Sequence, residues 1–206
     1  VNLMTAGRGI VHSERSPASE RQGGAVMSGM QTWLALPDGR EEIDPAFEHV
    51  PAAQLPIVEG EGVRACVIMG DLWGRRAPTT TYAETIYADI QLAPGASVPI
   101  DAGTDERAVV VALGDASLNG SPLELYTLYL LKPGVPMTLR SERGGRAMLL
   151  GGEAFAAPRH VWWNFVSSSR ERINQAKHDW KDGRFPSVPE EHEFIPLPEV
   201  PLTVSY

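Results

Sequence analysis

The sequence contains one pair of side chains whose types and spacing suit a metal site. His12 and Glu14 lie two residues apart at the end of the stretch GRGIVHSE. If this stretch forms a strand, its period of two residues places both side chains on one face, together with Ile10. An imidazole and a carboxylate that converge in this way can share an Fe, Mn, Ni, Cu or Zn ion. The spacing alone does not establish such a site, because any exposed strand can carry this pair.

The other four histidines lack neighbours that suit a metal site. His49 is predicted to be a loop residue, and His160 a packed or surface residue beside two tryptophans. His178 has Asn174 one helical turn before it, and His192 lies in the acidic run EEHEF, which is typical of a solvated segment. No histidine occurs between His49 and His160, so any histidine-rich centre is expected in the first part of the chain.

Signatures of other catalytic classes are missing. The sequence has no G-x-S-x-G, no Walker loop and no C-x-x-C. Ser13 follows His12 directly, and adjacent strand residues point to opposite faces, so this pair makes a poor catalytic dyad. The single cysteine, Cys66, lies in the run VRACVIMG and is predicted to be a small buried hydrophobic residue.

Strands dominate the elements that must position these residues. Turn signals recur every ~8–12 residues, which is typical of a β-sandwich or barrel. Asn119-Gly120 in particular predicts a tight turn. The expected strands cover 30–37, 62–70, 81–95, 106–120, 123–134 and 145–152.

One segment has a helical period, which predicts a single helix over 169–182. Its apolar face consists of Ile173, Ala176 and Trp180. Ser168 and Glu171 are expected to form a capping box, and Gly183 to end the helix as its C′ residue. The proline-rich residues after it predict an extended tail. The neighbouring aromatic residues are predicted to form a packing patch rather than a ligand stack: Trp162, Trp163 and Phe165.

The composition restricts the class of partner. The 206 residues carry a formal net charge of −8, which argues against direct nucleic-acid contact and favours a protein partner. No apolar run approaches the ~20 residues that span a membrane, and the N-terminus does not resemble a signal peptide. With one cysteine, no intrachain disulfide can form, so a cytoplasmic location is expected.

The motifs, taken together, resemble one family. MTAGRGIVHSE and GMQTWLALP are followed in order by ETIYADIQLAPGASVPI, GDASLNG, AMLLGGE and INQAKHDWKDGRF. This series closely resembles the pirin family of the cupin superfamily over nearly the whole chain. The resemblance implies two β-barrel cupin domains in tandem. It also implies one iron in the N-terminal barrel, held by three histidines and one glutamate, and a C-terminal barrel that has lost its metal.

Carried onto this sequence, the resemblance makes His12 and Glu14 two of the four metal ligands. The other two come from an H-x-H strand that precedes this motif in the family and is missing from the sequence. We therefore expect them in an upstream segment of the full-length protein. Fe(II) or another divalent transition metal is expected there and not in this chain alone, because two ligands rarely hold a catalytic metal.

The predicted fold class is all-β, with two tandem cupin-type β-barrels and one C-terminal α-helix. Residues 1–70 are expected to form the remainder of the N-terminal barrel, and residues 71–80 a linker. Residues 81–160 are expected to form the C-terminal barrel without metal. Residues 161–206 are expected to form the C-terminal helix and the extended tail.

The resemblance implies quercetin 2,3-dioxygenase-type cleavage of a flavonol with O₂. His12 would be a neutral nitrogen ligand, and Glu14 a ligand that also accepts the proton of the flavonol hydroxyl. The substrate would be a small aromatic molecule such as a flavonol, without nucleic-acid or membrane partners. Two alternatives stay open. One is a non-enzymatic, iron-dependent regulator that binds a transcription factor or a metabolic enzyme; the other is a cupin of unknown substrate with incidental quercetinase activity.

Overall fold

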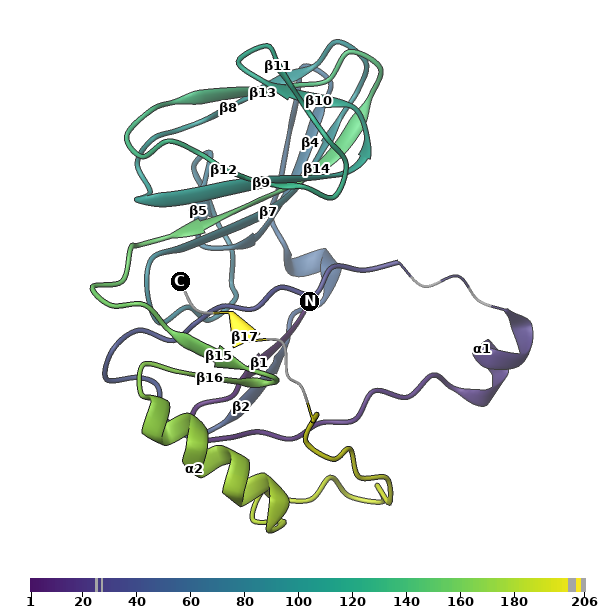
Figure 1. Ribbon diagram of the computed structural model, residues 1–206. Coiled ribbons are helices and arrows are strands. Elements are labelled where there is room, and N and C mark those ends of the chain that lie inside the picture. Colours follow the sequence, from purple (N-terminus) through teal and green to yellow (C-terminus); the bar gives the residue numbers. More distant parts are fainter. Residues whose placement is uncertain (25, 27, 200–202, 205–206) are drawn as a thin grey trace. The chain divides into compact units, whose positions relative to one another are not determined.

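The computed structural model describes residues 1–24, 26, 28–199 and 203–204, and this part of the chain is mostly β-structure (Figure 1). The helices are α1 (Ala18–Gly23), the 3₁₀ helix η1 (Ala52–Gln54) and α2 (Arg170–Lys181). The strands are β1 (Asn2–Thr5), β2 (Ala46–His49), β3 (Ile57–Gly60), β4 (Val63–Met69), β5 (Asp71–Leu72), β6 (Arg75–Arg76), β7 (Thr85–Leu92), β8 (Ser97–Ile100), β9 (Glu106–Gly114), β10 (Ala116–Leu118), β11 (Ser121–Leu123), β12 (Leu128–Leu130), β13 (Met137–Arg140), β14 (Gly145–Gly152), β15 (His160–Trp162), β16 (Phe165–Ser167) and β17 (Thr203–Val204).

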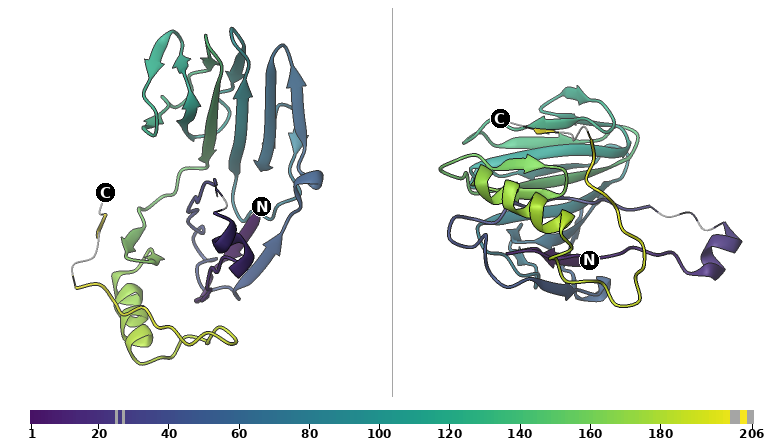
Figure 2. Two further views of the ribbon diagram at one scale, coloured as in Figure 1. Left: turned by 90° about the vertical axis from the view of Figure 1, so that its right-hand side faces the viewer. Right: turned by 60° about the horizontal axis from the view of Figure 1, so that its bottom comes forward.

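The chain divides into two compact units. Unit 1 comprises residues 1–3 and 47–155, and unit 2 comprises residues 4–46 and 156–206. Unit 1 contains a six-stranded sheet of order β12-β9-β14-β7-β4-β3 and a four-stranded sheet of order β11-β10-β13-β8 (Figure 2). Unit 2 contains α1, α2 and the sheet β16-β15-β17. A further pair, β1 and β2, lies where the chain passes from one unit to the other.

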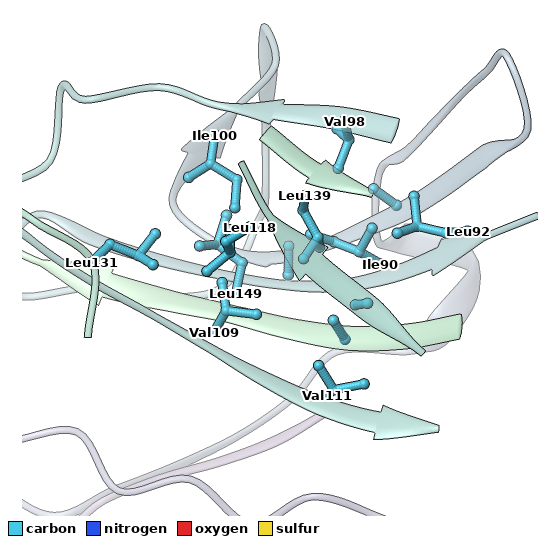
Figure 3. Close-up of a cluster of buried hydrophobic side chains, with 14 of the residues drawn as sticks. Ile90, Leu92, Val98, Ile100, Val109, Val111, Leu118, Leu131, Leu139 and Leu149 are labelled. Carbon is cyan, nitrogen blue, oxygen red and sulfur yellow. The ribbon is translucent and has the colours of Figure 1, made fainter. Parts of the chain in front are cut away.

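The core of unit 1 follows from strand alternation. On β7, Ile86, Ala88, Ile90 and Leu92 are all buried, as the period of two residues predicts. The strand pairs with β14 in antiparallel register, which brings Ala147 opposite Ile90. Figure 3 shows how side chains from both sheets meet in one cluster. Apolar side chains fill this interior.

Several predicted elements are confirmed. The strands predicted over 62–70, 81–95, 106–120 and 145–152 correspond to β4, β7, β9 with β10, and β14. The Asn119-Gly120 turn joins β10 to β11 with φ of 47° and 85°, the left-handed values that this tight hairpin turn requires. The segment predicted over 123–134 forms only the short strand β12.

The prediction of two barrels is not confirmed. Unit 1 is built from two packed sheets rather than a closed barrel. The strand predicted over 30–37 does not form, and Met30, Trp33 and Leu34 are 48%, 55% and 48% exposed. A strand needs a neighbouring strand, and none of the described sheets includes this stretch. The apolar period of the sequence alone did not specify such a neighbour.

The stretch predicted as a linker, residues 71–80, does not separate two sheets. β4, on one side of it, pairs directly with β7, on the other side. Between them, β5 and β6 form a tight hairpin in which Trp73 and Gly74 take positive φ. Residues 57–69 therefore belong to the same sheet as residues 85–92, and not to a separate first barrel.

The helix α2 in unit 2 confirms the helix that the helical period predicted over 169–182. Ile173 and Ala176 are buried, and Gly183 follows the C-cap with φ of 67°. The cap is Ser169 rather than the predicted Ser168, and its hydroxyl oxygen accepts a hydrogen bond from the backbone N–H of Arg172 at 3.2 Å. Figure 2 shows this helix in green, next to β15 and β16.

The tail after α2 has no regular secondary structure over residues 186–199, as expected of an extended segment. The remainder of the predicted tail at 200–202 and 205–206 lies outside the described residues. None of the helices in the described ranges combines the length and the apolar character that crossing a membrane requires.

Candidate functional site

His12 and Glu14 lie in an irregular segment, residues 9–17, that follows β1. Both side chains are exposed. The strand that would have placed both side chains on one face does not form over this stretch. No strand within the described ranges pairs with this segment, so nothing there encloses the two side chains. Their convergence on one ion stays a prediction.

A glycine turn holds the backbone just before the motif. Gly7 has φ of 52°, and the next residue, Arg8, donates its backbone N–H to the carbonyl oxygen of Ile43 at 3.0 Å. A Cβ atom on Gly7 would lie 2.1 Å from that same oxygen. Both the backbone conformation and the close approach therefore require glycine. The Gly-Arg-Gly part of the motif thus has a structural role that its spacing did not reveal.

The donor atoms of the motif are available for binding. Neither His12 nor Glu14 forms a hydrogen bond or an ion pair with another described residue. A neutral imidazole nitrogen and a carboxylate oxygen are ligands that Fe, Mn and Zn accept. No group of three or more His, Cys, Asp or Glu side chains converges within the described part of the chain. The two residues therefore fit part of a metal site, and its completion requires further donors.

Next to the motif, the surface of unit 2 is hollowed. An open hollow of about 470 Å³ is lined by Ser13 and Arg15 on one side and by residues 189–193 on the other. Its lining is polar and strongly acidic, with three glutamates in the second segment. His12 and Glu14 do not line it. A planar apolar substrate finds little apolar surface in this hollow.

Two buried arginines were missed at the level of sequence. Arg107, 2% exposed on β9, donates to the carbonyl oxygens of Asp101, Lys132 and Val135 at 2.5, 2.8 and 3.0 Å. It thereby ties together two loops of unit 1. No charge pattern could have predicted this role, because its partners are backbone atoms.

Arg159 has a comparable role in unit 2. Its side chain is 6% exposed and donates to the carboxylate of Asp38 at 2.6 Å and to the carbonyl oxygen of Leu36 at 3.0 Å. Its Nε lies 3.2 Å from Glu41, whose carboxylate also accepts from the hydroxyl and the backbone N–H of Ser168. This network fixes the turn at 36–41 against the C-terminal residues of the same unit.

Cys66 is no candidate nucleophile. It was predicted to be a small buried hydrophobic residue, but it is only half-buried on β4, between the buried Ala65 and Val67. Burial is the main cause that raises the pKa of its thiol, with the nearby carboxylate of Asp89 adding to the effect. A raised pKa disfavours the reactive thiolate.

The chain is similar to known proteins over most of its length. Residues 87–186 match the family described as the Pirin C-terminal cupin domain. A pirin-like protein of Caulobacter vibrioides is 43% identical over 201 residues, which are 97% of this chain and 69% of that protein. A Pseudomonas aeruginosa protein named "Putative quercetin 2,3-dioxygenase" is 35% identical, over 89% of this chain and 57% of its own length. The chain therefore spans between about half and about two thirds of these two relatives.

A solved structure shows the same fold. The crystal structure of quercetin 2,3-dioxygenase from Acinetobacter baumannii superposes with a TM-score of 0.83 at 29% sequence identity. The match covers 97% of this chain and 67% of that one. The similarity therefore extends over both units.

Proposed function

The chain belongs to the pirin family, and we propose that the intact protein is a metal-dependent dioxygenase that cleaves a flavonol such as quercetin. The observation that carries this proposal is the state of His12 and Glu14. Their donor atoms are exposed and have no partner among the described residues, directly after a glycine turn that fixes the backbone ahead of them. The likeness to proteins named as quercetin 2,3-dioxygenases supports the choice of reaction.

In this proposal, His12 and Glu14 hold Fe(II) or another divalent transition metal together with two further ligands of the intact protein. When bound, the metal would hold the flavonol and bring it together with O₂, and cleavage would release carbon monoxide and a depside. His12 contributes a neutral ring nitrogen, so it must be deprotonated at that atom. Glu14 accepts the proton of the flavonol hydroxyl, which leaves the substrate as the anion that reacts.

The test measures metal content and carbon monoxide release from quercetin, using the full-length protein. The wild type is expected to bind about one transition-metal ion per chain and to release carbon monoxide. His12→Ala is expected to lose the metal, and Glu14→Gln to lose both metal affinity and turnover. His178→Ala is the matched control, because that histidine is also exposed but lies on α2.

The outcomes separate the candidate functions. Carbon monoxide release that depends on His12 and Glu14 supports the dioxygenase. A bound metal that depends on both residues, with no release from quercetin, contradicts the dioxygenase and favours an iron-dependent regulator. Metal binding that survives both substitutions refutes the assignment of the ligands.

A further inference from the structure

The C-terminal residues of unit 2 hold the metal-ligand motif through contacts that involve neither of its predicted ligands. The guanidinium of Arg172 on α2 donates to the backbone carbonyl oxygen of Arg8 at 2.9 Å. The ring of Phe185 packs against Gly9. Arg15, one residue after Glu14, pairs with two glutamates of the tail. These contacts fall on both sides of His12 and Glu14.

The Arg15 contact is densely bonded. Its Nη2 donates to the Oε2 atoms of Glu191 and Glu193 at 2.6 and 3.0 Å, and its Nε reaches the Glu191 oxygen at 3.1 Å. The other oxygen of Glu191 accepts the backbone N–H groups of His192 and Glu193 at 2.9 and 3.0 Å. Both oxygens of Glu191 are thus engaged, and its side chain is only 18% exposed. A carboxylate held by backbone and by arginine at once offers a fixed anchor.

The contact at Gly9 is equally specific. A Cβ atom there would lie 2.8 Å from the Phe185 ring, and Gly9 has φ of 141°. Phe185 in turn stacks on Phe165 of β16 at a centroid distance of 6.0 Å and meets Trp180 of α2 edge-on at 5.5 Å. The residue that touches the backbone ahead of the motif is therefore itself anchored to a strand and to a helix.

The far end of the tail is anchored by the same ring cluster. Trp180 stacks on Phe194 at 5.5 Å and donates its indole N–H to the carbonyl oxygen of Ile195 at 2.8 Å. The segment 185–195 is thus held at both ends on α2, with Glu191 and Glu193 between them. The ring cluster confirms the predicted packing patch and extends it to include Trp180, Phe185 and Phe194.

We propose that residues 185–195 form a latch, and that Arg15, through Glu191 and Glu193, positions His12 and Glu14 for metal binding. This inference rests on the proposed function, because it takes these two residues as ligands. Arg15, Glu191 and Glu193 are positioning residues that touch neither ligand side chain. No described strand pairs with the motif, so the latch supplies the order that pairing in a sheet would otherwise give.

The physical effect is a reduced entropic cost of binding. An irregular segment loses backbone freedom when two of its side chains bind one ion, and this loss weakens the affinity. A latch that already restricts the segment removes part of that cost. Exposed ion pairs contribute little by themselves, and outer partners of metal ligands change the affinity by about 10- to 100-fold. For an indirect contact such as Arg15, we expect a loss of roughly three- to tenfold.

The experiment uses the full-length protein and titrates it with Co²⁺ in competition with a chelator. In parallel, hydrogen–deuterium exchange of residues 8–15 reports the order of the segment without metal. Arg15→Ala is expected to weaken Co²⁺ binding by roughly three- to tenfold and to speed exchange in 8–15. The exchanged-charge variant, Arg15→Glu with Glu191→Arg, is expected to recover part of both losses. Arg140→Ala is the matched control, since it removes another exposed arginine–glutamate pair, with Glu142 in unit 1.

His12→Ala separates this inference from the proposed function. If His12→Ala leaves Co²⁺ affinity unchanged, the ligand assignment fails and the latch proposal fails with it. If His12→Ala abolishes binding but Arg15→Ala matches Arg140→Ala in affinity and exchange, the ligands stand and the latch is refuted. If Arg15→Ala lowers the thermal stability of the whole protein, the Co²⁺ affinity of the exchanged-charge variant separates the latch from a general loss of stability. Recovery of affinity upholds the latch, and no recovery overturns it.

Discussion

Gly7 gives a sharp test of how the backbone ahead of the motif is held. Gly7→Ala places a methyl group 2.1 Å from the carbonyl oxygen of Ile43, in a backbone conformation with φ of 52°. The left-handed conformation costs an alanine about 1–2 kcal/mol. The methyl group must also displace the carbonyl that accepts the N–H of Arg8, and that hydrogen bond is worth about 1 kcal/mol. The free energy of unfolding should therefore fall by at least about 2–3 kcal/mol.

Gly39 is a matched control for this substitution. It lies in the same unit with φ of 75°, and a Cβ atom there would meet nothing within 4 Å. Gly39→Ala should therefore cost only the conformational part, about 1–2 kcal/mol. Urea denaturation followed by tryptophan fluorescence measures both, because Trp33, Trp162, Trp163 and Trp180 all lie in unit 2. Equal losses in the two variants would refute the reasoning, because the close approach to Ile43 would then have no energetic weight.

Three further predictions test other parts of the structure. Leu149→Ala removes a side chain that is 0% exposed and should lower the free energy of unfolding by about 2–5 kcal/mol. Leu130 is 80% exposed, and Leu130→Ala should change the free energy of unfolding by less than about 0.5 kcal/mol in the same urea titration. Arg15 and two backbone N–H groups lower the pKa of Glu191 from 4.5 to about 2, so the stability that this carboxylate contributes should be present above pH 4.5 and be lost as the pH falls towards 2. Carbon-detected NMR of the Glu191 carboxyl should show this pKa, and Arg15→Ala should move it back towards 4.5; an unchanged midpoint in the variant would contradict the pairing. Arg159→Ala leaves the turn at 36–41 without its buried cation. It should lower the melting temperature, and it should lower the free energy of unfolding by about 2 kcal/mol or more. A loss of free energy below about 0.5 kcal/mol would show that other contacts hold the turn.

The sequence predicted those elements whose partners are close or whose period is strong. β7 and β14 form one antiparallel pair. β7 buries every second residue from Ile86 to Leu92, whereas β14 is a short apolar run in which Ala147, Met148 and Leu149 are all buried. The Asn119-Gly120 turn was predictable because two successive positive φ values favour these two residue types. The helix α2 was predictable because Ile173 and Ala176 mark its buried face. In each case the physical cause lies within a few residues of the effect.

The errors arise where a distant contact decides the local structure. Ser168 was predicted to cap α2, but its hydroxyl and backbone N–H bond to Glu41, 127 residues away, and Ser169 takes over as the cap. The apolar residues at 30–37 predicted a strand, yet pairing depends on a neighbour that no local pattern specifies. Residues 71–80 read as a linker by composition, whereas the pairing of β4 with β7 makes them a hairpin connection.

In the candidate site too, some features could be predicted from neighbouring residues and others depend on distant contacts. The residue types and spacing of His12 and Glu14 define a donor pair, and this much is local. What fixes their backbone is not local: Ile43 holds the turn before them, and Glu191 contacts the residue after them from 176 positions away. Under the proposed function, metal affinity depends on segments that contact the motif from distant positions in the sequence, and substitutions there should change that affinity without changing the donor atoms.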